Sequence, residues 1–128
     1  TDAWCVARFQ VADLLRLELH SGRTHQIRVH LAHIGHPVVG DPVYGAGGSR
    51  RISGSARLIA EAVERAAGRQ ALHAASLAFK HPVTEAALEF RSEWPADLRL
   101  ALELAAGNSV SVAPDAALRY LLFFNRDG

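Results

Sequence analysis

The sequence predicts an α+β fold in which a mostly antiparallel sheet is combined with short helices. Three observations support this class. Strand-like runs come in neighbouring pairs, helical periodicity is confined to short stretches, and glycine or proline bounds most of these stretches. Neighbouring strands joined by short turns form antiparallel hairpins, and short helices between them give the α+β class.

The first residues are expected to form a β-hairpin. Residues 4–10 and 14–19 are rich in apolar and aromatic side chains, and residues 11–13 suit a turn between them. Cys5 lies in the first run, so we expect a buried thiol. It is the sole cysteine of the chain and cannot form an internal disulfide. This cysteine usage is typical of a reducing compartment, and we expect a cytoplasmic protein.

A short helix is predicted next, with Thr24 as its N-cap and Gly35 as its stop. Three apolar residues at helical spacing are expected to face the core: Ile27, Leu31 and Ile34. Arg28 lies at the edge of that face, where a long side chain can reach a cleft. After the helix, residues 37–40 are predicted to form a short strand.

The middle of the chain is predicted to contain a loop and a second helix. Four glycines mark residues 41–55 as a loop. Apolar residues at helical spacing then occupy residues 56–67, with Ser55 as the cap and Gly68 as the stop.

The last third of the chain is predicted to contain another hairpin and another helix. Residues 72–80 and 86–90 are the expected strands. Pro95 is expected to start a helix that ends near Ala106. The residues that follow are expected to pack on the rest of the domain.

Positive charge is concentrated between residues 20 and 81. This segment contains eight of the 14 lysines and arginines, all seven histidines and three of the 13 acidic residues. Such a field favours a phosphate backbone, although an ordinary solvated face would have the same composition. No apolar run approaches the roughly 18 residues of a membrane span, so no membrane association is expected.

The residues at 22–30 hold more hydrogen-bond donors than a hydrophobic core requires. With Thr24 as cap, Arg23 precedes the helix and suits phosphate binding at its N-terminus, while Arg28 points into a cleft. Asp41, between Gly40 and Pro42, is expected to bond nearby backbone in a turn rather than to act in catalysis. Tyr44 suits either stacking on a base or closing the loop.

A histidine series offers a competing interpretation. His30, His33 and His36 recur every three residues, but no further ligand is evident near them. We therefore expect no metal ion and keep a metal-dependent hydrolase as an alternative.

Taken in order, these motifs resemble the RNA pseudouridine synthases of the RluA/RluD-like family, isomerases that convert uridine to pseudouridine in ribosomal or transfer RNA. The resemblance runs from about Leu14 to Leu98. It rests on the following segments: GRTHQIRVH at 22–30, GHP at 35–37, GDPVY at 40–44, LHA at 72–74, FKHPVT at 79–84 and PADL at 95–98.

The resemblance implies a pseudouridine synthase catalytic fold, an RNA partner and no metal or organic cofactor. Arg28 corresponds to the basic residue that pairs with the family's catalytic aspartate and keeps it ionised. Ile27 and Leu72 correspond to apolar residues of the base pocket. The candidate substrate-binding residues are Arg23, His25, Gln26, Ile27, Tyr44 and Leu72.

The catalytic aspartate of that family lies in a His-Arg-Leu-Asp motif upstream of these segments, and no aspartate of this chain has that context. The chain also lacks methionine. We therefore expect residues 1–108 to be the C-terminal part of a catalytic domain and residues 109–128 its packing tail. Alone, this piece should be inactive and should self-associate through exposed strand edges. A non-catalytic RNA-binding module is the first alternative, ahead of the metal-dependent hydrolase.

Overall fold

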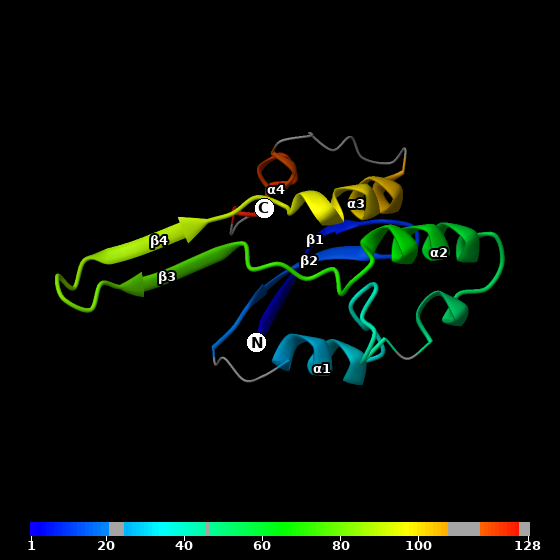
Figure 1. Cartoon of the computed structure of the whole chain (residues 1–128), viewed down its shortest axis with the longest axis horizontal. Helices are drawn as coiled ribbons and strands as arrows, with labels where there is room; N and C mark the ends of the chain where they lie inside the picture. The colour runs from blue at the N-terminus through cyan, green and yellow to red at the C-terminus, as the bar shows by residue number, and fades with distance from the viewer. Residues whose placement is uncertain (21–24, 46, 108–115, 126–128) are drawn as a thin grey trace.

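Two antiparallel hairpins and several short helices make up the computed structural model of the chain, which describes residues 1–20, 25–45, 47–107 and 116–125 (Figure 1). The α+β class is confirmed. Among the described residues, however, the two hairpins remain separate two-stranded sheets, so the expected single sheet is not formed there.

The first hairpin is confirmed. Strand β1 (Asp2–Arg8) pairs antiparallel with β2 (Asp13–Glu18), and the amide of Phe9 donates to the carbonyl of Ala12 across the turn, at 3.0 Å. The prediction of a buried Cys5 is wrong, because its side chain is exposed. In the described structure β1 pairs with one neighbour, and its first four residues are exposed.

The first helix, α1 (Gln26–His33), follows His25, which has the left-handed φ of 56°. The expected cap, Thr24, lies outside the described residues. The predicted core face is wrong: Ile34 is 63% exposed, and the buried residue of α1 is Arg28. The apolar stripe fails as a guide because α1 contributes no residue to either hydrophobic core cluster of the described structure.

The strand predicted at 37–40 is not formed, since these residues make a turn. The amide of Asp41 donates to the carbonyl of Val38 at 3.2 Å, and Gly40 has a φ of 74°. A ladder needs extended residues, and Gly40 bends the chain away from that conformation. The carbonyl of Val39 still accepts a bond from the amide of Ala71, at 2.8 Å.

A short 3-10 turn, η1 (Gly48–Arg51), interrupts the expected loop, and α2 (Ala56–Ala67) then forms with the predicted bounds. Gly68 ends α2 with a φ of 67°. The 3-10 turn η2 (Ala96–Leu98) leads into α3 (Arg99–Ala106). Helices α2 and α3 lie side by side around one of the two core clusters, whose buried members are Val63, Ala67, Leu98 and Ala101 (Figure 1).

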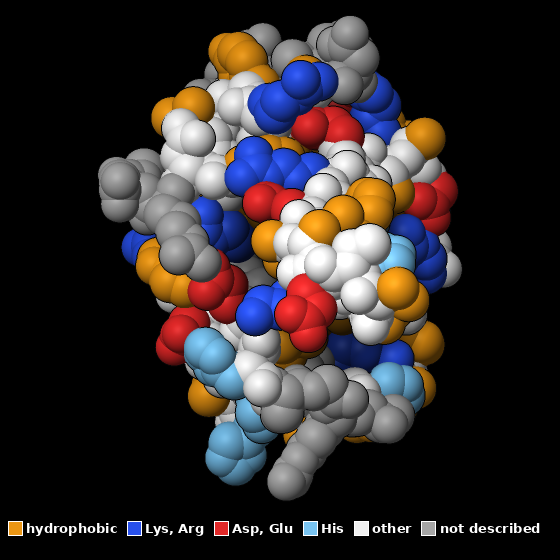
Figure 2. All heavy atoms as spheres, turned by 90° about the vertical axis from the view of Figure 1, so that its left-hand side faces the viewer, with side chains coloured by type: hydrophobic (Ala, Val, Ile, Leu, Met, Phe, Trp, Pro, Cys, Tyr) orange, Lys and Arg blue, Asp and Glu red, His pale blue; other side chains and the backbone are white. Residues whose placement is uncertain are grey.

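The second hairpin is confirmed and projects from the rest of the molecule (Figure 1). Its first strand is shorter than predicted, because residues 72–75 are not part of it. Strands β3 (Ser76–Lys80) and β4 (Ala87–Arg91) pair antiparallel. Their register places four apolar side chains on one face, here called the hairpin apolar face: Leu77, Phe79, Leu88 and Phe90. Leu77 is 60% exposed and Phe90 56% exposed. Figure 2 shows hydrophobic side chains between charged ones on the side from which the hairpin projects.

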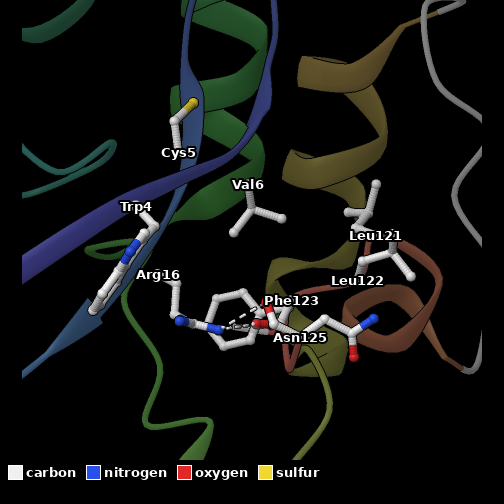
Figure 3. A pocket seen from close by; sticks show the side chains of 8 residues that line it. All are labelled: Trp4, Cys5, Val6, Arg16, Leu121, Leu122, Phe123 and Asn125. Carbon is white, nitrogen blue, oxygen red and sulfur yellow. Dashed lines mark hydrogen bonds between the residues drawn. The ribbon is translucent and has the colours of Figure 1, made fainter. Parts of the chain in front are cut away.

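The last described residues pack against the first hairpin. Helix α4 (Ala117–Tyr120) places Leu118 in the other core cluster, with 1% of its surface exposed. Buried Arg16 donates from Nη1 to the carbonyls of Phe123 and Asn125, at 3.1 and 3.2 Å, and its guanidinium lies 4.6 Å from the Trp4 ring centroid (Figure 3). These residues line a cavity of about 100 Å³.

In the part of the chain that the structure describes, no helix is long and apolar enough to cross a membrane.

Candidate functional site

A buried ion pair lies at the centre of the candidate site. Arg28 of α1 donates from Nε to one carboxylate oxygen of Asp41 at 2.9 Å and from Nη2 to the other at 2.7 Å. The side chains of Arg28 and Asp41 are 9% and 0% exposed. This two-point contact fixes the plane of the guanidinium, which a single bond would leave free to turn.

The Asp41 carboxylate also organises its own turn. It accepts hydrogen bonds from the backbone amides of Val43 and Tyr44, at 3.0 and 3.1 Å. The expectation that Asp41 bonds nearby backbone is therefore confirmed. The turn is tight at its far end, because a Cβ at Gly45 would lie 2.3 Å from the carbonyl oxygen of Asp41.

The pair is charged at neutral pH. The hydrogen bonds from Arg28 hold the pKa of Asp41 well below its usual range, and the two backbone amides act in the same direction against the opposing effect of burial. The bond to Asp41 also raises the pKa of Arg28. Both residues satisfy the rule that a buried charge needs a hydrogen-bonded partner.

An aromatic side chain covers the same arginine. The Arg28 guanidinium carbon lies 5.2 Å from the centroid of the Tyr44 ring, within the range of a cation–π contact. The Tyr44 hydroxyl is hydrogen-bonded to Nδ1 of His25 at 3.2 Å, and the two rings meet edge to face. The structure thus brings together three of the predicted site residues, His25, Arg28 and Tyr44.

The other predicted residues are distributed differently. Gln26 donates from Nε2 to the hydroxyl of Thr1 at 2.9 Å. Ile27 and Leu72 both line a large open hollow of about 2,230 Å³, which also borders Asp41. Arg23 lies outside the described residues. Ile27 and Leu72 are therefore both among the many residues that line this extended hollow, and Asp41 is the member of the buried pair that borders it.

The histidine series does not form a metal site in the described structure. His30, His33 and His36 are exposed, and histidines gather at the lower end of the face in Figure 2. No group of three or more His, Cys, Asp or Glu side chains among the described residues is arranged to hold a metal ion. The hydrolase alternative is therefore not favoured.

Sequence reasoning assigned no partner within this chain to Arg28. One signal was available, since Asp41 is the sole acidic residue between His20 and Glu61. A buried arginine in that segment has few candidate acidic partners, and Asp41 was already expected to be held in a turn. The missed step was to combine burial of Arg28 with that scarcity of acids.

Comparison with known proteins finds relatives that match part of the chain. No family model matches the chain. The chain is 48% identical over 90 residues to the ribosomal large subunit pseudouridine synthase D of Escherichia coli K12, which covers 70% of this chain and 27% of that protein. The protein of the same name from Vibrio cholerae is 50% identical over 84 residues, covering 66% and 25%. That of Pseudomonas aeruginosa is 45% identical over 97 residues, covering 76% and 30%.

Over about 70% of its length the chain is similar to proteins named ribosomal large subunit pseudouridine synthase D, at 45–50% identity, which is consistent with an RluA/RluD-like pseudouridine synthase. It spans about a quarter of the length of the curated relatives that it matches, which carry the name ribosomal large subunit pseudouridine synthase D.

Proposed function

We propose that this chain forms the arginine-bearing side of the active site of an RNA pseudouridine synthase that acts on ribosomal RNA. The relatives support the reaction and the substrate class, because their names state both. The structural observation that carries the proposal is Arg28, a buried guanidinium fixed at two points by Asp41. Asp41 in turn lines a hollow that Ile27 and Leu72 also line.

The proposed task of Arg28 is to hold a catalytic carboxylate in its ionised form. A carboxylate that attacks a nucleoside must be charged, and a neighbouring guanidinium lowers its pKa and fixes its orientation. Asp41 takes the Nε and Nη2 donors of Arg28. The catalytic carboxylate would then use Nη1, which has no hydrogen-bond partner among the described residues.

The proposed base pocket uses the apolar part of the hollow. An enzyme that modifies a base must take the base out of the stack and receive it between apolar walls and a few fixed polar groups. Ile27 and Leu72 would supply such walls. His25 and Tyr44 would border the substrate from the loop side, and Gln26 and Arg23 would contact the RNA backbone.

Three further expectations belong to this proposal. None of the aspartates lies in a His-Arg-Leu-Asp motif, so the 128-residue chain alone would not isomerise uridine. The hairpin apolar face would make the isolated chain self-associate. An enzyme acting on ribosomal RNA would work in the cytoplasm, and transfer RNA remains an alternative substrate to test in the same assay.

A chimera gives the direct test. The 128-residue chain would replace the corresponding part of the Escherichia coli relative, and tritium release from RNA labelled at uridine C5 would report isomerisation. We expect activity on ribosomal RNA from the chimera and none from the chain alone. A folded chimera that binds RNA without releasing tritium would contradict the proposal and favour the non-catalytic RNA-binding module.

A further inference from the structure

Two adjacent arginines of η1 lack the acidic partners that most described arginines have. Arg50 and Arg51 are exposed and form no ion pair with any described residue. By contrast, Arg57 pairs with Glu61 at 3.1 Å, and Arg69 pairs with Asp97 at 2.7 Å. Two neighbouring guanidinium groups without carboxylates suit an external anion.

A carboxylate nonetheless holds the turn that carries these arginines. Glu64 of α2 accepts a hydrogen bond from the backbone amide of Ser49, at 2.8 Å. The contact is close, because a Cβ at Gly48 would lie 2.7 Å from Glu64 Oε2, and Gly48 has a φ of 51°. Glu64 thus holds η1 against α2 through a backbone hydrogen bond. It forms no ion pair with the side chains of Arg50 and Arg51.

The same arginines border the hollow of the proposed base pocket. Arg50, Arg51 and Arg65 are among the residues that line it, as are Ile27 and Leu72. Arg65 is exposed and likewise has no ion-pair partner among the described residues. A single-stranded or looped RNA presents bases and phosphates. The apolar side chains of the hollow suit the bases, and the guanidinium groups suit the phosphates.

We propose that Arg50 and Arg51 form a phosphate-binding site for the RNA backbone and that Glu64 is its positioning residue. The choice of RNA as the ligand rests on the proposed function. The two arginines bind the phosphate groups of nucleotides that flank the one held in the hollow. Glu64 fixes the turn from which both side chains extend.

The first test measures RNA binding by the full chain. Fluorescence anisotropy of a labelled RNA stem-loop, over a series of salt concentrations, gives the affinity and its salt dependence. Replacing both arginines (R50A with R51A) should lower the affinity roughly tenfold and reduce the slope of log affinity against log salt by about 1.5. The control, R99A with R119A, removes the same charge outside the hollow and should change the slope little. Equal effects of the two pairs would overturn the proposal.

The second test uses the sign of a charge effect. Glu64→Ala makes the chain more positive, so general electrostatic attraction alone would strengthen RNA binding. The proposed site predicts the opposite, a weakening of about fivefold, because η1 loses its anchor. Glu64→Gln keeps an oxygen acceptor for the Ser49 amide and should not weaken binding. Stronger binding by the alanine variant would refute the positioning role.

These outcomes are separable from those of the proposed function. If RNA binding depends on Arg50 and Arg51 but the chimera does not isomerise uridine, the phosphate-binding site is supported and the enzyme assignment is contradicted. If the chimera is active and R50A with R51A changes neither its activity nor its RNA affinity, the enzyme assignment is supported and the phosphate-binding site is contradicted.

Discussion

The guanidinium of Arg28 and the carboxylate of Asp41 meet edge to edge, with both Asp41 oxygens engaged at 2.7 and 2.9 Å. The same carboxylate closes the turn that carries Tyr44. One acidic residue therefore fixes both the arginine and the aromatic ring that covers it.

Replacing Asp41 with asparagine should destabilise the fold by about 3 kcal/mol, because Arg28 would keep a buried charge without its partner. Urea unfolding followed by circular dichroism measures the change. Asp97→Asn is the matched control, since it removes an arginine partner from an exposed pair and should have little effect. Equal losses in the two variants would mean that burial of the Arg28–Asp41 pair contributes nothing.

The stability supplied by Asp41 should depend on pH in one direction. Its pKa in the folded chain lies below the value of about 4 expected in the unfolded chain, so the unfolded chain takes up the proton first on acidification. The contribution is complete above about pH 5 and is lost as the pH falls through the folded-state pKa. The difference in unfolding free energy between the wild type and Asp41→Asn should therefore shrink below about pH 4. A difference that stays constant in acid would contradict this account.

Gly40 and Gly54 provide a comparison at nearly equal backbone angles, with φ of 74° and 75°. Alanine at Gly54 meets no atom within 4 Å and should cost about 1 kcal/mol for the left-handed conformation. Alanine at Gly40 would place its Cβ 2.3 Å from the carbonyl oxygen of Arg69, which should add about 1–3 kcal/mol. Thermal unfolding of the two variants distinguishes these costs, and equal melting temperatures would show that the chain relieves the clash without loss.

Arg28→Lys in the chimera should separate charge from geometry. Lysine keeps the positive charge but loses the flat, two-point contact with Asp41. We expect kcat to fall about 100-fold with little change in KM, as when one preorganised donor is removed. A rise in KM at constant kcat would instead assign Arg28 to RNA binding.

The hairpin apolar face should govern self-association of the isolated chain. Threonine in place of Phe79 and Phe90, which stack with ring centroids 6.0 Å apart, keeps strand propensity and removes apolar area. Sedimentation velocity should then shift toward the monomer. The control places threonine at Ala78 and Ala87, on the opposite face of the same hairpin. A monomeric wild-type chain at high concentration would refute the expectation.

Short-range sequence patterns correctly predicted the elements that are formed by residues close together in the chain, namely α2 and the two hairpins. Helix α2 has its predicted bounds because Gly68 permits the left-handed conformation that ends it. Both hairpins were predictable from paired apolar runs. The strand at 37–40 failed because Gly40 bends a run whose composition suits a strand, and a strand requires a partner that sequence alone does not provide.

The sequence predicted several residues of the candidate site but not the contacts between them. The donors at 22–30 marked His25 and Arg28, and the turn chemistry marked Asp41. Burial of Arg28 was missed because helical periodicity assigns polar residues to water. Its contact with Asp41 spans 13 positions and depends on how the turn folds back on α1. Glu64 gave no signal either, since it bonds a backbone amide rather than a charged side chain.

The exposed thiol on β1 has a practical consequence. Cys5 is the sole cysteine of the chain, so a fluorophore can be attached at one defined position without engineering the sequence. Cys5 also lines the small cavity with Leu121, Phe123 and Asn125. The emission of such a dye would report whether the carboxy-terminal segment stays docked while RNA is titrated, in the unmodified chain and in each variant built upon it.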